Sequence, residues 1–192
     1  MNDCTIRRAR RSDCAAIARL YSISSDGVAD YIWSRLAGPG EALLDVGRRR
    51  YEREDTPFSY RNCQVVDSGD GVVGMLVAFP AEAGDENGDG PEDPVLAPYA
   101  ALEDPGSYYV CGVALFPEYR GRGLGTRLMA LAEQDAAAVG LDRTSLVVFR
   151  ENAGALRLYQ RLGYSEIGRA RVVPHPLIRV TGDALLMVKH LA

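Results

Sequence analysis

Residues 113–129 read VALFPEYRGRGLGTRLM, and this stretch decides the fold. It joins an uncharged, β-rich run at 108–116 to a helical stripe of apolar residues at 123–139. A second β-rich run follows at 144–149. A strand, a helix and a strand in this order predict two parallel strands with a right-handed crossover. Because 108–116 carries no charge, we expect the first strand to be covered on both faces.

The turn between this strand and its helix is rich in glycine. Its residues are Arg120, Gly121, Arg122, Gly123, Leu124, Gly125 and Thr126. Glycine allows a tight turn and lets a ligand approach the backbone amides with no side chain in the way. The first amides of a helix have no internal partner and lie at the positive end of its dipole. The turn is therefore a candidate site for a phosphate or pyrophosphate, and its two arginines add positive charge.

Three kinds of phosphate loop compete for this turn. The Walker pattern needs a Gly-Lys pair, which the sequence does not contain. A dinucleotide fingerprint needs glycine where Thr126 stands, although Glu151 lies near the position of a ribose-binding acid. The third pattern, [Q/R]xxGx[G/A], is met at Arg120, Gly123 and Gly125. It is the acyl-CoA loop of the GCN5-related N-acetyltransferases, a superfamily that the chain resembles.

Two further stretches carry the same resemblance. Residues 152–164, NAGALRLYQRLGY, resemble the next helix of that superfamily, and residues 183–191, DALLMVKHL, resemble its closing strand. The resemblance implies an α/β fold with a mixed sheet, the acyl-CoA N-acyltransferase fold, whose two parallel central strands splay apart around acetyl-CoA. It is clearest over 108–168. We expect one acetyltransferase domain over 1–192, in keeping with the length of the chain.

The resemblance also implies which residues bind acetyl-CoA. The amides of 121–126 would hold the pyrophosphate, and the pantetheine arm would pair with the strand edge at Val113, Ala114 and Leu115. On the following helix, Asn152 and Ala155 are the implied cofactor-binding positions, with Asn152 in polar contact with the arm. A plain helix cap explains Asn152 equally well, so both roles stay open. No metal is expected.

Acyl transfer from a thioester to an amine needs an acid for the leaving thiolate. Tyr159 matches the general acid of the superfamily by its place in the motif, although its spacing fits a packed aromatic residue equally well. A backbone N–H near Leu115 is a candidate oxyanion donor, and such a donor contributes about 3 kcal/mol. We expect direct transfer in a ternary complex, with Cys111 a small core residue rather than an acyl carrier.

The base that would deprotonate the amine is harder to identify. Some enzymes of this class carry a glutamate on the central strand, whereas residues 108–116 contain no acid. We favour a water relay or Glu103 or Asp104, just upstream, over Glu118 and His175. The surrounding segment, 81–107, is acidic and rich in Gly and Pro, and it predicts a surface excursion with a short helix near 95–103. It would either attract cationic acceptors or simply aid solubility.

The remaining elements follow from periodicity and turn residues. The sequence predicts a helix capped by Ser12 or Asp13, and another that starts at Asn152 and ends at Gly163. A helical zone at 28–54 is broken at 38–40. Strands are predicted at 4–8, 61–67, 72–79, 164–173 and 183–190, the second and third forming a hairpin.

Composition excludes several classes of protein. The chain of 192 residues is 47% hydrophobic and 25% charged, as is typical of a globular domain. Its net charge of −4 argues against a nucleic-acid binder, and the lack of a long apolar run argues against a membrane protein. The first residues lack the apolar core of a secretory signal, so we expect a cytoplasmic protein. Four scattered cysteines without a CxxC pair predict neither a zinc nor a redox site.

The predicted function is N-acetylation of a small-molecule or peptide amine with acetyl-CoA. One alternative is a non-catalytic acyl-CoA-binding or regulatory module of the same fold. Another is a nucleotide-binding oxidoreductase half, which Thr126 and the short chain after 149 disfavour. The identity of the acceptor stays open. A homodimer is compatible with the resemblance, because many relatives of this fold pair.

Overall fold

A computed structural model describes residues 4–82 and 93–191. The chain forms two compact units, one of Met1–Ala78 with Gly112–Met129 and the other of Phe79–Cys111 with Ala130–Ala192. The strands follow the hydrogen-bonding order β1-β2-β3-β4-β5-β7-β6, a seven-stranded mixed sheet that confirms the predicted fold class.

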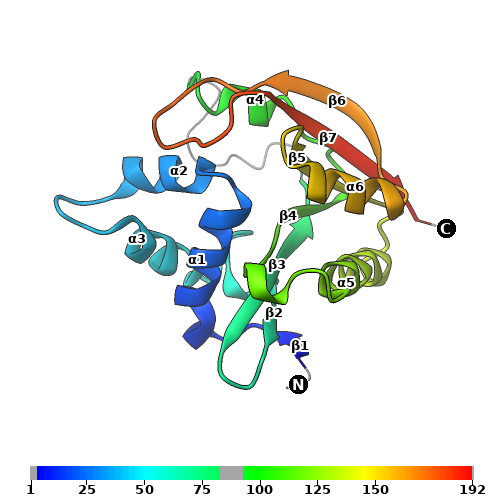
Figure 1. The fold of residues 1–192 in the computed structure, drawn as a ribbon, viewed down its shortest axis with the longest axis horizontal. Helices are drawn as coiled ribbons and strands as arrows, with labels where there is room; N and C mark the ends of the chain where they lie inside the picture. The colour runs from blue at the N-terminus through cyan, green and yellow to red at the C-terminus, as the bar shows by residue number, and fades with distance from the viewer. Residues whose placement is uncertain (1–3, 83–92, 192) are drawn as a thin grey trace. The chain divides into compact units, whose positions relative to one another are not determined.

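The first unit contains an antiparallel strand group formed by β1 (Thr5–Arg8), β2 (Cys63–Asp67) and β3 (Val72–Pro80). All three strands were predicted within one or two residues. The turn between β2 and β3 contains Gly69 and Gly71 at φ values of 90° and 149°, which other residues rarely adopt. This conformation joins the two strands as the predicted hairpin (Figure 1).

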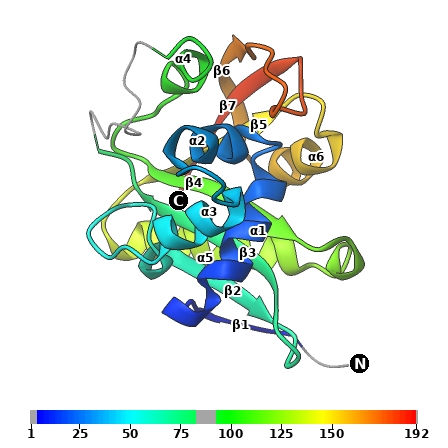
Figure 2. The ribbon, with the colours of Figure 1, turned by 90° about the vertical axis from the view of Figure 1, so that its left-hand side faces the viewer.

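Three helices pack together in the same unit (Figure 2): α1 (Cys14–Ser24), α2 (Val28–Leu36) and α3 (Leu43–Tyr51). The last two replace the predicted helical zone, and the break falls between them as expected. Trp33 and Tyr51 are buried among these helices. A Cβ at Gly47 would stand 2.6 Å from the Trp33 ring, so only glycine allows this close approach.

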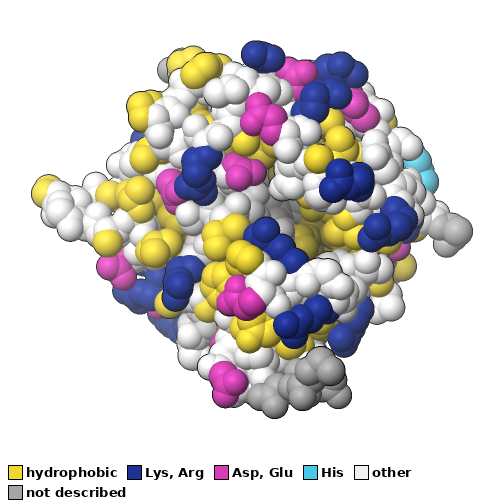
Figure 3. All heavy atoms as spheres, viewed as in Figure 1, with side chains coloured by type: hydrophobic (Ala, Val, Ile, Leu, Met, Phe, Trp, Pro, Cys, Tyr) yellow, Lys and Arg dark blue, Asp and Glu magenta, His cyan; other side chains and the backbone are white. Residues whose placement is uncertain are grey.

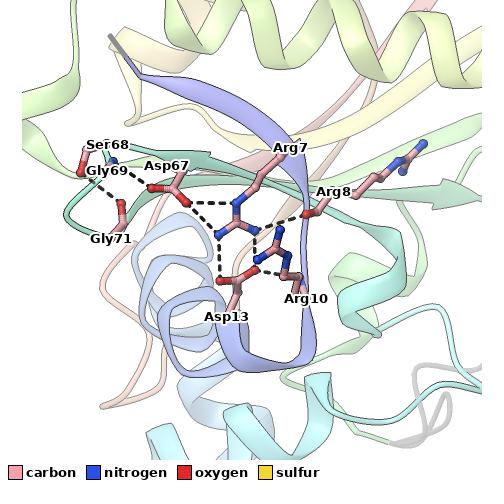
Figure 4. A network of polar contacts seen from close by, with 8 residues as sticks. All are labelled: Arg7, Arg8, Arg10, Asp13, Asp67, Ser68, Gly69 and Gly71. Carbon is pink, nitrogen blue, oxygen red and sulfur yellow. Dashed lines mark hydrogen bonds and ion pairs between the residues drawn. The ribbon is translucent and has the colours of Figure 1, made fainter. Parts of the chain in front are cut away.

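Asp13 has a different role from the one predicted. A short 3₁₀ helix, η1 (Arg11–Asp13), precedes α1, and the Asp13 side chain does not cap α1. Its carboxylate instead accepts hydrogen bonds from Arg7 Nη1 and from the Arg10 backbone N–H, both at 2.7 Å (Figure 4). Arg7 also donates to Asp67 at the end of β2. The Arg7 guanidinium therefore engages the Asp13 carboxylate that was expected to cap α1. Through Arg7, η1 is linked to strands β1 and β2.

The pKa of Asp13 reflects this network. Burial alone would raise the pKa of this carboxyl, but the hydrogen bonds from Arg7 and from the Arg10 N–H outweigh it and lower the pKa. Asp67 also accepts from the Gly69 N–H, which lowers the Asp67 pKa together with the bond from Arg7. Both carboxylates are therefore charged at neutral pH, and the one guanidinium of Arg7 bonds to both of them.

Two elements contribute residues to both units. Strand β4 spans Tyr108–Leu115, and helix α5 spans Leu124–Ala138. Between them lies a 3₁₀ turn, η3 (Pro117–Tyr119). Burial alternates along β4, with Tyr108, Val110, Gly112 and Ala114 buried and the intervening residues half-buried. The prediction that both faces are fully covered is therefore wrong, because apolar side chains on the second face stay partly open to solvent.

The second unit contains β5 (Arg143–Phe149), β6 (Ser165–Arg171) and β7 (Asp183–His190), with β7 antiparallel to both of its neighbours. Helix α6 (Ala153–Arg161) follows β5. Strand β4 pairs with β5 in parallel, as the strand–helix–strand order predicts. The buried side chains of Leu146, Leu185 and Met187 form much of the core of this unit.

Only part of the acidic segment is described. Residues 83–92 lie outside the described residues, and a short helix, α4 (Ala97–Ala100), lies within the predicted range.

On the face drawn in Figure 3, basic and acidic side chains are interspersed. Among the described residues, no helix combines the length and apolarity that crossing a bilayer requires.

Candidate functional site

The glycine-rich turn leaves its backbone open in the first unit. Gly121 and Gly123 have φ values of 71° and 76°, in the left-handed region that favours glycine. A Cβ built on either glycine meets no heavy atom within 4 Å. The turn therefore adopts a conformation that needs glycine, and open space lies beside its backbone.

Helix α5 begins directly after these glycines. The Arg127 N–H donates to the Gly123 carbonyl at 3.1 Å, which is the first bond of the helix. The N–H groups of Leu124, Gly125 and Thr126 precede this bond and have no partner within the helix. The buried Leu124 side chain anchors this end of α5. The arrangement is a set of fixed donors at a helix N-terminus, which favours an anion.

The two arginines of the turn bond to the backbone that leads into it. Arg120 Nε donates to the Leu115 carbonyl at 3.0 Å, and Arg122 Nη2 donates to the Glu118 carbonyl at 2.7 Å. The Arg122 guanidinium also lies 5.2 Å from the centroid of the Tyr119 ring. Both guanidiniums thus stabilise the connection between β4 and α5. The sequence did not indicate this role.

The end of β4 carries the predicted pantetheine-binding residues Val113, Ala114 and Leu115. The parallel ladder between β4 and β5 joins Tyr108–Val110 to Thr144–Leu146 and includes none of these three residues. On the side of the first unit, Phe116 N–H donates to the Val73 carbonyl of β3. A Cβ on Gly74 would collide with the Leu115 side chain, so glycine in β3 makes room for Leu115.

Gly112 marks a second close approach on β4. A Cβ at this position would stand 3.0 Å from both the Tyr21 ring and Ser24 Oγ of α1. Helix α1 therefore lies directly against the backbone of β4 at this residue. Sequence reasoning missed this contact, because the only local signal is a glycine within a β-rich run.

Asn152 caps helix α6 in the second unit. Its Oδ1 accepts a hydrogen bond from the Ala155 N–H at 3.1 Å, which confirms the capping role. The Asn152 side-chain amide nitrogen keeps its donors for another partner, since the cap uses only the oxygen. The structure therefore establishes the cap and leaves the cofactor contact a prediction.

Tyr159 lies on the inner face of α6. The residue is 8% exposed, and its ring centroid lies 5.9 Å from that of Tyr164. Burial raises the pKa of the Tyr159 hydroxyl to about 12. The hydroxyl is therefore protonated at neutral pH and has a proton to donate. The sequence offered both a packed aromatic and a catalytic role, and this packing is compatible with both.

The candidate bases differ in their surroundings. Asp104 accepts from Arg143 Nε and Nη2 at 2.9 and 3.2 Å, so both of its carboxylate oxygens already have a partner. His175 Nδ1 accepts a hydrogen bond from the Leu177 N–H at 3.2 Å, so this ring nitrogen is already used within its own loop. Glu103 is exposed, and its charge adds to the burial that raises the pKa of Tyr109.

Cys111 lies on the half-buried face of β4, the face that it shares with Tyr109 and Val113 as alternation predicts. Its thiol is not part of a disulfide. Among the described residues, no group of three or more His, Cys, Asp or Glu side chains is arranged to hold a metal ion.

The predicted site residues fall into two groups. The first unit holds Val113–Leu115 and the turn from Arg120 to Thr126 in one continuous stretch of chain. The second holds Asn152 at the N-cap of α6, with Ala155 and Tyr159 within that helix. Sequence reasoning missed Tyr164, whose ring contacts that of Tyr159, and Thr144, which shares a hydrogen bond with the Tyr164 hydroxyl. The aromatic residue after Leu-Gly was the available signal for Tyr164.

Comparison with known proteins identifies a family and several relatives of parts of the chain. The family model described as "Acetyltransferase (GNAT) family" matches residues 29–164. A mycothiol acetyltransferase from Tsukamurella paurometabola is 35% identical over 108 residues, which cover 54% of this chain and 35% of that protein. Another, from Corynebacterium aurimucosum, is 42% identical over 60 residues, covering 31% and 19%. The matched stretches thus span about a third or less of these curated relatives.

Solved structures support the fold. A crystal structure described only as an acetyltransferase has a TM-score of 0.70 at 21% identity, covering 98% of this chain and all of the other. A polyamine N-acetyltransferase from Drosophila melanogaster has a TM-score of 0.66 at 19% identity with the same coverage. At such low identity, these similarities establish the shared fold alone.

Proposed function

This chain belongs to the GNAT family of acetyltransferases, and from that premise we propose that it transfers an acetyl group from acetyl-CoA to a primary amine. Transfer is direct, in a ternary complex with a small-molecule or peptide acceptor. The observation that carries the proposal is the turn before α5, with its open backbone at Gly121 and Gly123 and its helix amides without internal partners. The family match covers parts of both units, which supports one acetyltransferase domain.

The cofactor would be held by backbone rather than by side-chain charge. Bound acetyl-CoA supplies an activated acyl thioester. Amides of Gly121–Thr126 would hold its pyrophosphate, and the edge of β4 at Val113, Ala114 and Leu115 would pair with its amide-rich arm. Arg120 and Arg122 brace the turn that presents these amides. Asn152 and Ala155 complete the proposed binding residues.

Tyr159 would act as a hydrogen-bond donor to the leaving sulfur. Its pKa of about 12 lies well above the value of about 8.5 for a free thiol. Full transfer of the proton is thus uphill by roughly 3.5 units, or about 5 kcal/mol. A hydrogen bond that strengthens as negative charge develops on sulfur avoids this cost. A backbone N–H near Leu115 would stabilise the oxyanion.

The acceptor amine must lose a proton before attack. A lysine-like amine with a pKa near 10.4 costs roughly 4 kcal/mol to deprotonate near pH 7.5. Because Asp104 is held by Arg143, Glu103 or a water relay is the better candidate for accepting this proton. Two of the similar curated proteins are named mycothiol acetyltransferases, but the matched stretches cover about a third or less of those proteins, so the acceptor of this chain is a separate question.

A thiol-release assay tests this function. The protein, acetyl-CoA and a panel of amines and peptides are mixed, and free coenzyme A is measured with a thiol reagent. We expect release with at least one primary amine, and a large loss of kcat in Tyr159→Phe, which keeps the ring packing. Acetyl-CoA binding by calorimetry without thiol release would instead indicate a non-catalytic binding module. An absence of binding at millimolar acetyl-CoA would refute both functions.

A further inference from the structure

The end of helix α6 folds back onto Tyr159. Gly163 has a φ of 93°, and this left-handed residue reverses the chain after the helix. The Tyr164 N–H consequently donates to the Tyr159 carbonyl at 3.0 Å. The same reversal brings the two rings together, with an interplanar angle of 59°. The ring of Tyr164 therefore packs directly against the ring of Tyr159.

The far end of Tyr164 is fixed to strand β5. Its hydroxyl shares a 2.7 Å hydrogen bond with Thr144 Oγ1. Thr144 is 0% exposed, and its backbone is paired with Tyr108 of β4 and with Lys189 of β7. Tyr164 itself is 3% exposed. The hydrogen bond thus joins the ring beside Tyr159 to a strand that is paired on both sides.

The hydrogen bond between Tyr164 and Thr144 is not needed to fill the space between α6 and β5. A phenylalanine and a valine would fill nearly the same volume without burying two hydroxyls, and burying polar groups costs free energy unless they are paired. A fully paired buried hydrogen bond instead fixes one arrangement of the side chains around it. The position held in this way is that of Tyr159, whose ring contacts Tyr164 within the same unit.

We propose that Tyr164 and Thr144 are positioning residues, which hold the Tyr159 ring so that its hydroxyl points in one direction. The inference rests on the proposed role of Tyr159. Tyr164 does not act on the substrate, and its effect reaches the reaction through Tyr159 alone. Misdirection of a catalytic group by a fraction of an ångström lowers kcat and leaves cofactor binding intact.

Steady-state kinetics of Tyr164→Phe and Thr144→Val test the proposal, since each removes one hydroxyl and keeps the side-chain volume. We expect kcat to fall about five- to tenfold in each variant, as for loss of one well-placed hydrogen bond, with the KM for acetyl-CoA unchanged. The double variant should match the single ones, because both remove the same bond. Tyr60→Phe is the matched control: it removes a tyrosine hydroxyl bonded to Glu54 and should leave kcat unchanged.

Two outcomes separate this inference from the function on which it rests. In a Tyr159→Phe background, Tyr164→Phe should cause no further fall in kcat, and an equal fall there would overturn the proposal. If Tyr159→Phe leaves kcat at the wild-type value, the role of Tyr159 itself fails.

A readout independent of activity is ultraviolet titration of the tyrosines in Thr144→Val, which retains every tyrosine. The titration curve of the double variant, Thr144→Val with Tyr159→Phe, is subtracted from that of Thr144→Val alone. The difference between the two curves is the titration of Tyr159. Loosened packing should lower the pKa of Tyr159 below its value of about 12. An unchanged Tyr159 titration, with kcat also unchanged, refutes the positioning role whether or not the acceptor is known.

Discussion

Replacing Asn152 separates its capping role from its proposed contact with acetyl-CoA. The cap is a neutral hydrogen bond of 3.1 Å from the Ala155 N–H to Asn152 Oδ1 at an exposed helix end. Loss of such a cap costs about 1 kcal/mol, which lowers Tm by about 2–4 °C in a chain of this length. Asn152→Ala removes both the cap and the amide donors. Asn152→Ser keeps an oxygen that caps the helix but lacks the amide nitrogen.

The two variants should therefore share one defect and differ in the other. We expect a lower Tm only in Asn152→Ala, measured by calorimetric scanning, since serine caps about as well as asparagine. Both should bind acetyl-CoA about fivefold more weakly by titration calorimetry, as expected for one lost hydrogen bond. If both variants bind acetyl-CoA as tightly as the wild type, Asn152 is a cap alone and the reasoning from the motif is refuted.

Three further changes test other parts of the structure. Asp13→Asn should lower the free energy of unfolding in urea by about 2–3 kcal/mol at neutral pH, because it breaks a part-buried ion pair with Arg7. The wild-type advantage should disappear as pH falls through the lowered pKa of Asp13. Tyr159 ionises near pH 10 in the unfolded chain but only near pH 12 in the folded protein. As the pH rises from about 10 to about 12, the free energy of unfolding of the wild type should therefore fall by about 3 kcal/mol more than that of Tyr159→Phe. Gly123→Ala, at a φ of 76°, should cost about 1 kcal/mol in denaturant titrations and weaken acetyl-CoA binding, whereas unchanged binding would argue against the loop.

Local patterns predicted most of the fold. The periodicity at 123–139 gave α5 (Leu124–Ala138), and the turn residues around Gly69 gave the β2–β3 hairpin. These signals succeed because helix and strand periods and turn conformations depend on neighbouring residues. The glycine-rich turn was likewise visible, since the positive φ values at Gly121 and Gly123 suit that residue type.

Contacts between distant residues were beyond local reasoning. Ser12 or Asp13 was expected to cap a helix, but the Asp13 carboxylate bonds to Arg7, and Arg7 reaches Asp67 only after β1 and β2 pair. The bond between Thr144 and Tyr164 depends on how α6 ends against β5, which no spacing in the sequence reveals. Exposure along β4 was also misjudged, because an uncharged strand can still leave one face partly open.

The internal bonds of the two arginines in the turn affect how the protein would respond to ionic strength. Arg120 and Arg122 each commit a guanidinium N–H to a carbonyl oxygen, and both residues are exposed, so their full positive charges stay fixed in solvent beside the turn. Mobile ions screen exposed charges of this kind, whereas hydrogen bonds from uncharged amides respond little to salt. Affinity for a polyanion at this turn should consequently fall as electrolyte is added and then level off at the part that the amides supply.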